Sequence, residues 1–320
     1  MIQISFILPC YNVEKYIADC LESLYSQDIS ENEYEVICVN DCSTDNTREI
    51  ILKYGKNHSN LRLIDHDVNK NAGAARNTGI TKANGQYIWF VDPDDMIKPK
   101  CLSELLEIAN KKELDILMFN FDAIDEIYEN TINVKDTYSY SNVLKGIDYV
   151  ETFFNGNLSG ITIVWQQLFR KEFILAHNIY FPELRIGEDC IFSWKSILNA
   201  EKVQSVLSHY YTYRRNNQSI TLKKATSNIF YDKYLQFPLE VKKILHKKNI
   251  YPQFIYKDLT QIAKWTANNF IKNTNELTLS EKKKFVKLIS RNCCTLLKLP
   301  YLSYKSKFII LLSKFGCVFY

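Results

Sequence analysis

The chain has 320 residues, 46% of them hydrophobic, which suffices for one large domain or for one domain with an appendage. It contains no run of 18 or more apolar residues and no basic leader with a cleavage site, so neither a membrane-spanning helix nor a signal peptide is expected. The net charge of +4 hides a division, because residues 1–220 carry 21 Lys and Arg against 31 Asp and Glu, whereas residues 221–320 carry 19 against 5.

Strands and helices are expected to alternate along the first 120 residues. Hydrophobic runs and their flanking turn residues predict strands at Ile4–Leu8, Glu35–Asn40, Leu61–His66, Tyr87–Val91 and Asp115–Asn120, and helices at Glu14–Gln27, Asp45–Gly55, Ala72–Ala83 and Pro99–Lys111. Such alternation predicts an α/β fold of Rossmann type, with a mostly parallel sheet and flanking helices. Ligands of such sheets bind at the carboxyl ends of the strands.

The fourth predicted strand ends in three carboxylates, Asp92, Asp94 and Asp95. At an effective dielectric near 20, two negative charges about 5 Å apart repel each other by about 3 kcal/mol, so the turn needs protons, solvent or a cation. Carboxylates without His or Cys suit a hard ion such as Mg²⁺ or Mn²⁺. The alternative is a solvated acidic turn that caps the helix expected from Pro99.

Two further strand ends carry polar residues. Asp45 and Thr47 are interpreted as helix N-caps, whereas Asp41 directly follows a buried run, where it can accept hydrogen bonds from a nucleoside. In Asn71–Gly79, small residues allow a helix N-terminus to approach a ligand, and Arg76 is available for a phosphate or a carboxylate. The alternative there is helix–sheet packing glycines with a surface arginine.

Four of these motifs together resemble the family 2 glycosyltransferases of the glycosyltransferase A (GT-A) fold. The matching segments are Ser5–Asn12, Val39–Asp45, Asn71–Gly79 and Asp92–Asp95, in the family's order, and a weaker match continues through Trp165–Arg170 and Gly187–Asp189 to His209–Arg214. The strong match covers about residues 1–120. Cys42 stands where the family usually has glycine, which leaves Asp41 in register.

The resemblance implies a nucleotide-sugar donor, with UDP-sugar as the expected type, lying across the strand ends. The implied donor-binding residues are Pro9, Tyr11, Asn12 and Asp41 for the pyrimidine and ribose, Arg76 for the diphosphate, and Asp92 for the ribose or the sugar. Asp94 and Asp95 would bind a divalent metal, Mn²⁺ or Mg²⁺, which stabilises the charge developing on the leaving diphosphate. Arg185 is a looser candidate for the diphosphate.

The base that deprotonates the acceptor hydroxyl is assigned by the resemblance to Asp189, with Glu188 as its competitor. Both precede the predicted helix Ile191–Leu198, so either one can instead cap that helix. Candidate acceptor or diphosphate contacts are Trp165, Gln166, Arg214 and Ser219. For Trp165 the alternative is a core position, and for Arg214 and Ser219 it is the end of an ordinary edge strand.

Nine cysteines, without paired Cys-x-x-Cys spacing, indicate reduced core residues of a cytoplasmic protein. The remaining histidines, among them His58 and His66, have no partner at metal-ligand spacing and are interpreted as surface or structural residues.

Beyond Thr221 the sequence becomes basic and helical, with helices predicted at Tyr231–Lys248, Pro252–Ile271, Ser280–Leu297 and Lys305–Phe319. An anionic membrane surface is the preferred partner, because each basic residue near such a surface contributes about 1 kcal/mol. Nucleic acid is not expected, since no nucleic-acid-binding motif occurs. The alternative is a helical bundle that packs on the catalytic domain or on a second copy in a homodimer.

The sequence therefore predicts a GT-A catalytic domain at 1–220, with a nucleotide-sugar half at about 1–120 and an acceptor half at about 121–220, followed by a basic helical region at 221–320. The expected function is metal-dependent, inverting transfer of a sugar to a saccharide or lipid-linked acceptor of a cell-surface polysaccharide, in the cytoplasm or peripherally at the inner face of the plasma membrane. The alternatives are a sugar-phosphate nucleotidyltransferase, for which the first strand lacks a Gly-rich loop, and a scaffold protein that binds the donor without catalysis.

Overall fold

The computed structural model describes residues 1–126, 130–132, 134–154, 163–184 and 187–216. Contacts divide the chain into two compact units, and the larger one, at 1–153, 160–184 and 188–223, contains nearly all of the described residues. The predicted domain boundary near residue 219 and the four predicted helices after it lie outside the described residues.

The predicted elements of the first 120 residues are all present, with ends shifted by a few residues. The described strands are β1 (Ile4–Cys10), β2 (Tyr34–Asn40), β3 (Leu61–Asp65), β4 (Tyr87–Phe90), β5 (Met96–Ile97), β6 (Ile116–Asp125), β7 (Asn130–Ile132), β8 (Gln167–Arg170) and β9 (Val203–Arg215). The described helices are α1 (Ile17–Tyr25), α2 (Thr47–Gly55), α3 (Asn71–Lys82), α4 (Leu102–Lys111), α5 (Gly146–Phe154), α6 (Lys171–Ala176) and α7 (Glu188–Asn199), with short 3-10 turns at Glu31–Glu33 and Val164–Gln166.

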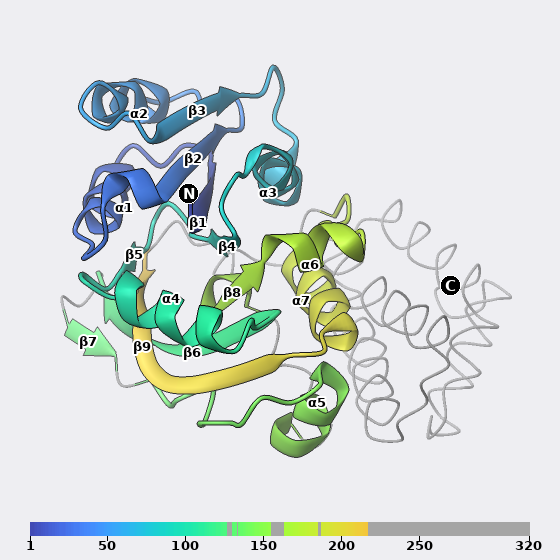
Figure 1. The fold of residues 1–320 in the computed structure, drawn as a ribbon. Coiled ribbons are helices and arrows are strands. Elements are labelled where there is room, and N and C mark those ends of the chain that lie inside the picture. The colour runs from blue at the N-terminus through green and yellow to red at the C-terminus, as the bar shows by residue number, and fades with distance from the viewer. Residues whose placement is uncertain (127–129, 133, 155–162, 185–186, 217–320) are drawn as a thin grey trace, which may run out of the picture. The chain divides into compact units, whose positions relative to one another are not determined.

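The strands form one sheet in the order β3-β2-β1-β4-β8-β6-β9-β5, with β7 beside β6 (Figure 1). The pairs β3–β2, β2–β1 and β1–β4 are parallel, so their carboxyl ends meet at one edge. Strand β8 then runs antiparallel to both neighbours, and β9 lies parallel to β6. The predicted α/β class is confirmed, and the end of β9 is flanked by β6 and β5 rather than forming an edge.

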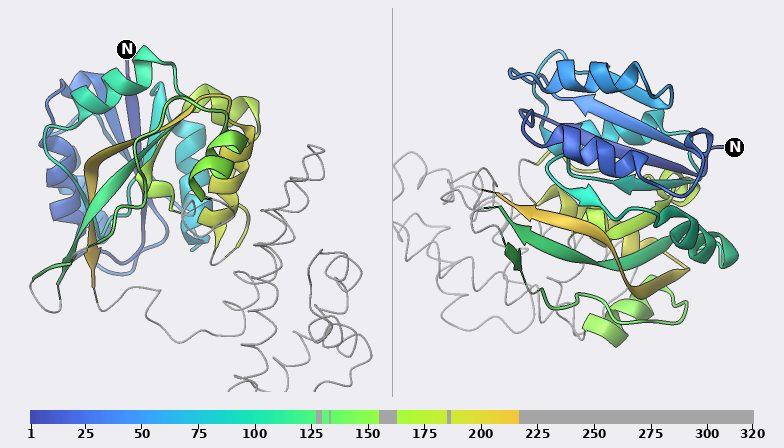
Figure 2. Two further views of the ribbon diagram at one scale, coloured as in Figure 1. Left: turned by 90° about the horizontal axis from the view of Figure 1, so that it is seen from below. Right: turned by 90° about the vertical axis from the view of Figure 1, so that its left-hand side faces the viewer.

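Helices cover both faces of the parallel strands (Figure 2). Phe6 and Trp89 point to the face of α1, where their ring centroids are 5.7 Å apart within the main hydrophobic cluster. Ile7 and Phe90 alternate to the other face, as expected for strands buried on both sides. There Ile7 meets α3, and a Cβ built at Gly79 would lie 2.2 Å from Ile7 Cγ2. Glycine at position 79 therefore lets α3 lie directly on β1, which places the N-terminal half of α3 beside the strand ends.

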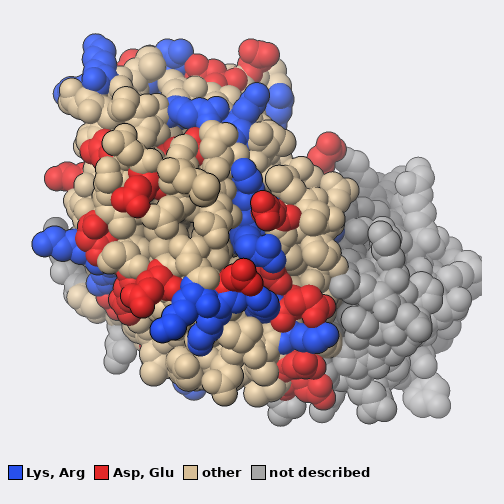
Figure 3. Space-filling model, in the orientation of Figure 1, with Lys and Arg blue, Asp and Glu red and all other residues tan. Residues whose placement is uncertain are grey.

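Within the described residues, no helix is both long enough and apolar enough to cross a membrane. Acidic and basic side chains lie interspersed over the face of the molecule shown in Figure 3. Four of the cysteines in this part of the chain, Cys10, Cys20, Cys38 and Cys101, are buried free thiols, in agreement with the prediction of reduced core residues.

Candidate functional site

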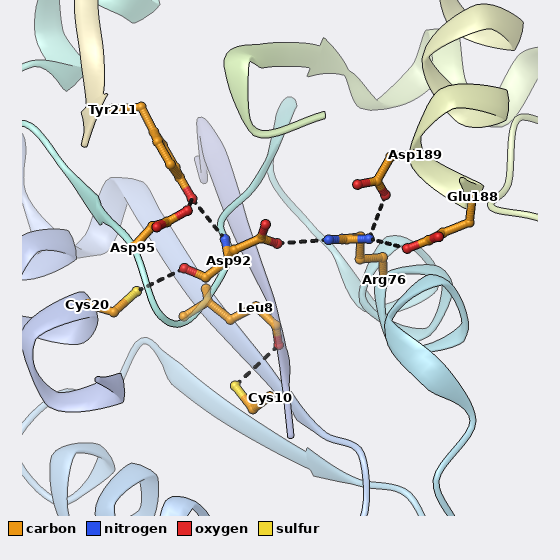
Figure 4. A network of polar contacts seen from close by, with 9 residues as sticks. All are labelled: Leu8, Cys10, Cys20, Arg76, Asp92, Asp95, Glu188, Asp189 and Tyr211. Carbon is orange, nitrogen blue, oxygen red and sulfur yellow. Dashed lines mark hydrogen bonds and ion pairs between the residues drawn. The ribbon is translucent and has the colours of Figure 1, made fainter. Parts of the chain in front are cut away.

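The acidic turn begins directly after β4, at the carboxyl end of the parallel strands. Val91 N donates to Ile7 O of β1, and Asp95 N donates to Asp92 O at 3.0 Å, which closes the turn. Cys20 Sγ of α1 lies 3.8 Å from the same Asp92 carbonyl oxygen (Figure 4). Contacts with β1, with α1 and within the turn itself therefore hold the backbone from Val91 to Asp95 in one conformation.

Residues at and just after the end of β9 form hydrogen bonds with Asp94 and Asp95 of the turn. Tyr211 Oη donates to Asp95 Oδ2 at 2.7 Å, and the backbone N of Arg214 donates to Asp95 Oδ1 at the same distance (Figure 4 shows the tyrosine contact). Asn216 Nδ2 donates to Asp94 Oδ2 at 3.0 Å. Both oxygens of Asp95 therefore have partners, and this residue is only 1% exposed, whereas Asp94 is partly exposed.

Burial and the neighbouring charges of Asp94 and Asp92 raise the pKa of Asp95 well above its usual range. Burial and Asp92 likewise raise the pKa of Asp94 to about 6. In the part of the chain that the structure describes, no group of three or more His, Cys, Asp or Glu side chains is arranged to hold a metal ion. The assignment of Asp94 and Asp95 as a metal pair stays a prediction, and the geometry separates them: Asp94 is the accessible member and Asp95 anchors the turn.

Arg76 of α3 joins the acidic turn to the start of α7. Its Nη2 donates to Asp92 Oδ1 at 2.8 Å, while its Nη1 donates to Glu188 Oε1 at 3.2 Å and to Asp189 Oδ1 at 2.7 Å (Figure 4). Its guanidinium also lies 5.3 Å from the centroid of the Phe181 ring. Arg76 is 4% exposed, so the prediction of a freely available diphosphate ligand gives way to a buried cation shared by three carboxylates.

The motif around Arg76 also positions the chain that leads into α7. Asn77 Nδ2 donates to Phe181 O at 2.9 Å, and Phe181 N donates back to Asn77 Oδ1 at 2.8 Å. A Cβ at Gly73 would lie 3.1 Å from Glu188 Cγ, so the small residue at position 73 leaves room for that side chain. Asn77 and Gly73 of α3 therefore fix the position of the segment around Phe181 and of Glu188, which lie more than 100 residues later in the chain.

Glu188 and Asp189 both lie in the first turn of α7, but they differ in accessibility. The side chain of Asp189 is 29% exposed and that of Glu188 is 11% exposed. Loss of solvation raises the pKa of both carboxyls, and for Asp189 well above the usual range, although Arg76 opposes the shift. The pKa of Arg76 is raised because the three carboxylates outweigh the effect of its burial. Of the two predicted bases, Asp189 has the more exposed side chain.

The predicted nucleoside site lies at the ends of β1 and β2. Pro9 is buried within β1, whereas Tyr11 is 47% exposed. Asn12, with φ of 52°, accepts from Thr44 N through its Oδ1 at 2.8 Å, which ties the two strand ends together. Asp41 is 2% exposed, so only its edge faces solvent.

Cys42 also has a positive φ, 63°, in the region that glycine adopts most readily. A glycine, which the resemblance leads us to expect at this position, would adopt this conformation without strain.

Asp45 Oδ1 accepts from Thr47 N, the first amide of α2, and its Oδ2 accepts from Glu14 N, both at 3.0 Å. The N-cap position itself is Asn46, so the prediction of Thr47 as an N-cap is wrong: Thr47 is the first residue of the helix, and its hydroxyl accepts from Val13 N instead.

The candidate acceptor contacts Trp165 and Gln166 are buried, which favours the alternative of a core position that the sequence left open for Trp165. Trp165 is 7% exposed and stacks on Tyr211 with ring centroids 4.3 Å apart. Gln166 is fully buried, and its Nε2 donates to Phe119 O at 3.2 Å. The Trp165 ring also meets Phe121 of β6 in an edge-to-face contact, with ring centroids 4.9 Å apart, so it packs among aromatic side chains of β6 and β9.

Arg214 is also more structural than predicted. Its Nη2 donates to Asp19 Oδ2 at 2.9 Å, its guanidinium lies 5.3 Å from the Tyr16 ring centroid, and the residue is 9% exposed. The candidates Arg185 and Ser219 lie outside the described residues. Sequence reasoning missed Tyr211 and Asn216 as partners of the acidic turn, and the only available signal was the alternation of tyrosines along β9.

Comparisons with known proteins identify the family to which the chain is related. The family model of glycosyl transferase family 2 matches residues 5–174. The chain is 34% identical over 220 residues to the putative glycosyltransferase EpsH of Bacillus subtilis, covering 68% of this chain and 62% of that protein. It is 30% identical over 265 residues to the poly(ribitol-phosphate) beta-N-acetylglucosaminyltransferase TarS of Staphylococcus aureus, covering 80% of this chain and 44% of TarS. The chain thus spans less than two thirds of either relative.

Solved structures show the same fold. Residues 1–349 of S. aureus TarS in complex with UDP-GlcNAc match 99% of this chain and 88% of that chain, with a TM-score of 0.74 and 23% identity. The mannosyltransferase PcManGT of Pyrobaculum calidifontis in complex with GDP-Man and Mn²⁺ matches with a TM-score of 0.54 and 14% identity, covering 99% of this chain and 87% of that one. Because the family model covers more than half of the sequence, the chain belongs to glycosyl transferase family 2.

Proposed function

We propose that this chain is a glycosyltransferase that moves a sugar from a nucleotide-diphosphate donor, with UDP-sugar as the preferred type, to a saccharide or lipid-linked saccharide. The observation that carries the proposal is the Asp92–Arg76–Asp189 connection, which sets an accessible carboxylate of raised pKa beside the carboxyl ends of the parallel strands. The name of its relative TarS, a poly(ribitol-phosphate) beta-N-acetylglucosaminyltransferase, supports the reaction class.

In the proposed reaction, Asp189 accepts the proton of an acceptor hydroxyl as that oxygen bonds to the anomeric carbon of the donor sugar. The bond from the same carbon to the diphosphate oxygen breaks, and the diphosphate leaves with that electron pair. A carboxylate of raised pKa is a stronger base than an ordinary one, and Arg76 at 2.7 Å fixes its direction. A single displacement of this kind inverts the anomeric centre.

The nucleoside would lie between Tyr11 and Asp41. The exposed ring of Tyr11 offers a face for stacking, and Asp41 offers a carboxylate to an N–H or hydroxyl group. Asn12 holds the loop between them through Thr44. Asp92, with its side chain 27% exposed, would face the ribose or the sugar from the other side of the strand ends.

A divalent cation fits the acidic turn. Asp94 is more accessible than Asp95, the charges of Asp92 and Asp95 lie beside it, and the donor atoms are hard carboxylate oxygens. Asp94 would hold Mn²⁺ or Mg²⁺, with Asp95 anchoring the turn behind it. When bound, the metal ion would stabilise the negative charge that develops on the leaving diphosphate.

The test is a panel of UDP-, GDP- and dTDP-sugars with Mn²⁺ or Mg²⁺, monitored by thermal stabilisation and by nucleotide release. Asp94→Asn is expected to lower the metal-dependent affinity for the donor by about 10-fold or more, because one hard anionic ligand is lost. Asp148→Asn, which changes an exposed carboxylate of α5, is the matched control and should bind like the parent.

A parent protein that neither binds nor consumes any nucleotide sugar would contradict the proposed function. Release of pyrophosphate from a nucleoside triphosphate and a sugar phosphate would instead support the nucleotidyltransferase alternative. Donor binding without turnover, with every acceptor class offered, would support the scaffold alternative.

We further propose that the acceptor belongs to a cell-surface polysaccharide and that the basic segment 221–320 contacts an anionic membrane at its inner face. The excess of 19 Lys and Arg over 5 Asp and Glu in that segment supports the second part. The full chain is expected to sediment with vesicles containing anionic lipid and to be released by high salt, since exposed charges are screened. Equal sedimentation with zwitterionic vesicles would contradict membrane attraction, and a dimer by analytical ultracentrifugation would support the homodimer alternative.

A further inference from the structure

His66 lies just beyond β3, between the predicted nucleoside ligand Asp41 and helix α3. Its Nδ1 is 2.7 Å from Asp41 Oδ1, and its Nε2 is 2.9 Å from Thr78 Oγ1 of α3. The side chains of His66 and Asp41 are 6% and 3% exposed. Because each ring nitrogen of this buried histidine has a partner, the orientation of the imidazole is defined. One partner is a carboxylate at the edge of the sheet where the ligand is expected.

The partners also define the tautomer of a neutral imidazole. A carboxylate oxygen can only accept, so Nδ1 carries the proton that it donates to Asp41. Nε2 is then the acceptor, and the hydroxyl of Thr78 donates to it. Thr78 thus keeps the imidazole in the form that donates to Asp41.

Asp41 receives a second hydrogen bond on the same oxygen, from the backbone N of Lys70 at 2.9 Å. Its carbonyl oxygen accepts from Asn69 Nδ2 at 3.1 Å. None of the described residues donates to Oδ2 of Asp41. Two donors on Oδ1 restrict the orientation of the carboxylate, and Oδ2 keeps its capacity to accept a hydrogen bond from a ligand.

We infer that His66 is a positioning residue for nucleobase selection, acting through Asp41 and supported by Thr78. A fixed carboxylate oxygen accepts the ring N–H of uracil, thymine or guanine, whereas the matching ring nitrogen of cytosine or adenine is itself an acceptor and is rejected. This inference rests on the proposed function, because it requires that a nucleotide binds at this edge.

The experiment measures the affinity of the full chain for UDP, dTDP, GDP, CDP and ADP by calorimetry, and kcat and KM with the preferred nucleotide sugar. His66→Leu removes the donor and is expected to weaken UDP binding by about 10-fold and to lower the UDP-to-CDP affinity ratio by a similar factor. kcat at saturating donor should stay within about threefold, because the reacting atoms are not touched.

Two further variants separate positioning from folding. His66→Asn keeps an N–H near the place of Nδ1 and should restore most of the selectivity, whereas Thr78→Val removes the hydroxyl with little change of shape and should lower the ratio partially. His58→Leu is the matched control, since His58 stacks on Tyr25 and pairs with Glu31 on another part of the surface.

An unchanged UDP-to-CDP ratio in His66→Leu would overturn the inference while leaving the proposed function intact. If His66→Leu fails to fold, an unchanged ratio in Thr78→Val has the same meaning. A parent protein that prefers CDP or ADP would also overturn the inference but not the proposed function. A parent protein that binds none of the five nucleotides would contradict both.

Discussion

Asp189→Asn is expected to lower the rate of sugar transfer at saturating substrates by about 10²- to 10⁴-fold, the range that a general base contributes. The amide cannot take the proton of the acceptor, yet its oxygen can still accept from Arg76 at the place of Asp189 Oδ1. Donor affinity should therefore stay within about threefold of the parent value. The measurement is kcat from nucleotide release, together with the dissociation constant of the nucleotide sugar.

The pH dependence of the parent enzyme tests the role of Asp189 in a second way. A base must be ionised to act, and loss of solvation raises the pKa of Asp189 well above its usual range. Activity should therefore rise with pH through that raised pKa, so the acid limb lies above the range of an ordinary aspartate. Glu188→Gln is the comparison, since the side chain of Glu188 is only 11% exposed. Unchanged turnover in Asp189→Asn would refute the base assignment.

Arg76→Met is expected to lower the free energy of unfolding by about 3–5 kcal/mol, the usual cost of breaking a buried ion pair on one side only. The substitution leaves Asp92, Glu188 and Asp189 together without their shared cation. The pKa values of Glu188 and Asp189, which burial raises and Arg76 lowers in the parent, then rise further in the folded protein, so the folded state binds more protons than the unfolded state. Stability of the variant must accordingly fall as pH rises, and the deficit relative to the parent should be larger at pH 8 than at pH 5.

Urea unfolding of both proteins at the two pH values measures this difference. Arg48→Met is the matched control, because Arg48 also pairs with a carboxylate, Asp65, but the two side chains are 45% and 40% exposed. Solvent screens such a surface pair, so Arg48→Met should change the free energy of unfolding much less than Arg76→Met does. Arg76→Lys keeps the charge without the three contacts and should lie between parent and methionine variant. A parallel pH dependence of Arg76→Met and parent would show that the carboxylates do not depend on Arg76.

Local patterns predicted the elements and the edge of the sheet where the polar residues gather. The run Ile4–Leu8, which forms most of β1, is short and apolar, so its strand type could be predicted locally. The alternation of such runs with helices predicted the parallel pairing. The carboxyl ends of β1, β2 and β4 then had to share one edge. The resemblance of the same segments to family 2 glycosyltransferases was confirmed by the family comparison.

The roles of individual side chains depended on partners far along the chain. Asp94 and Asp95 are adjacent, and only the approach of Tyr211 and Asn216, more than 115 residues later, makes one an anchor and the other accessible. Trp165 illustrates the converse, since an indole suits a sugar face and a core equally well until Tyr211 covers it. Asp41 and His66 are separated by a helix and a strand, which conceals their pairing in the sequence.

The hydrogen bonds from the end of β9 to the acidic turn limit which fragments of this protein can keep the turn in place. A fragment ending near residue 120 would contain every motif of the donor side, yet it would lack Tyr211, Arg214 and Asn216, which hold Asp94 and Asp95. We therefore expect such a fragment to lack the hydrogen bonds that orient the two carboxylates, even if its strands form. Because the bond from residue 214 to Asp95 comes from the main chain, this bond tolerates any side chain there but excludes proline.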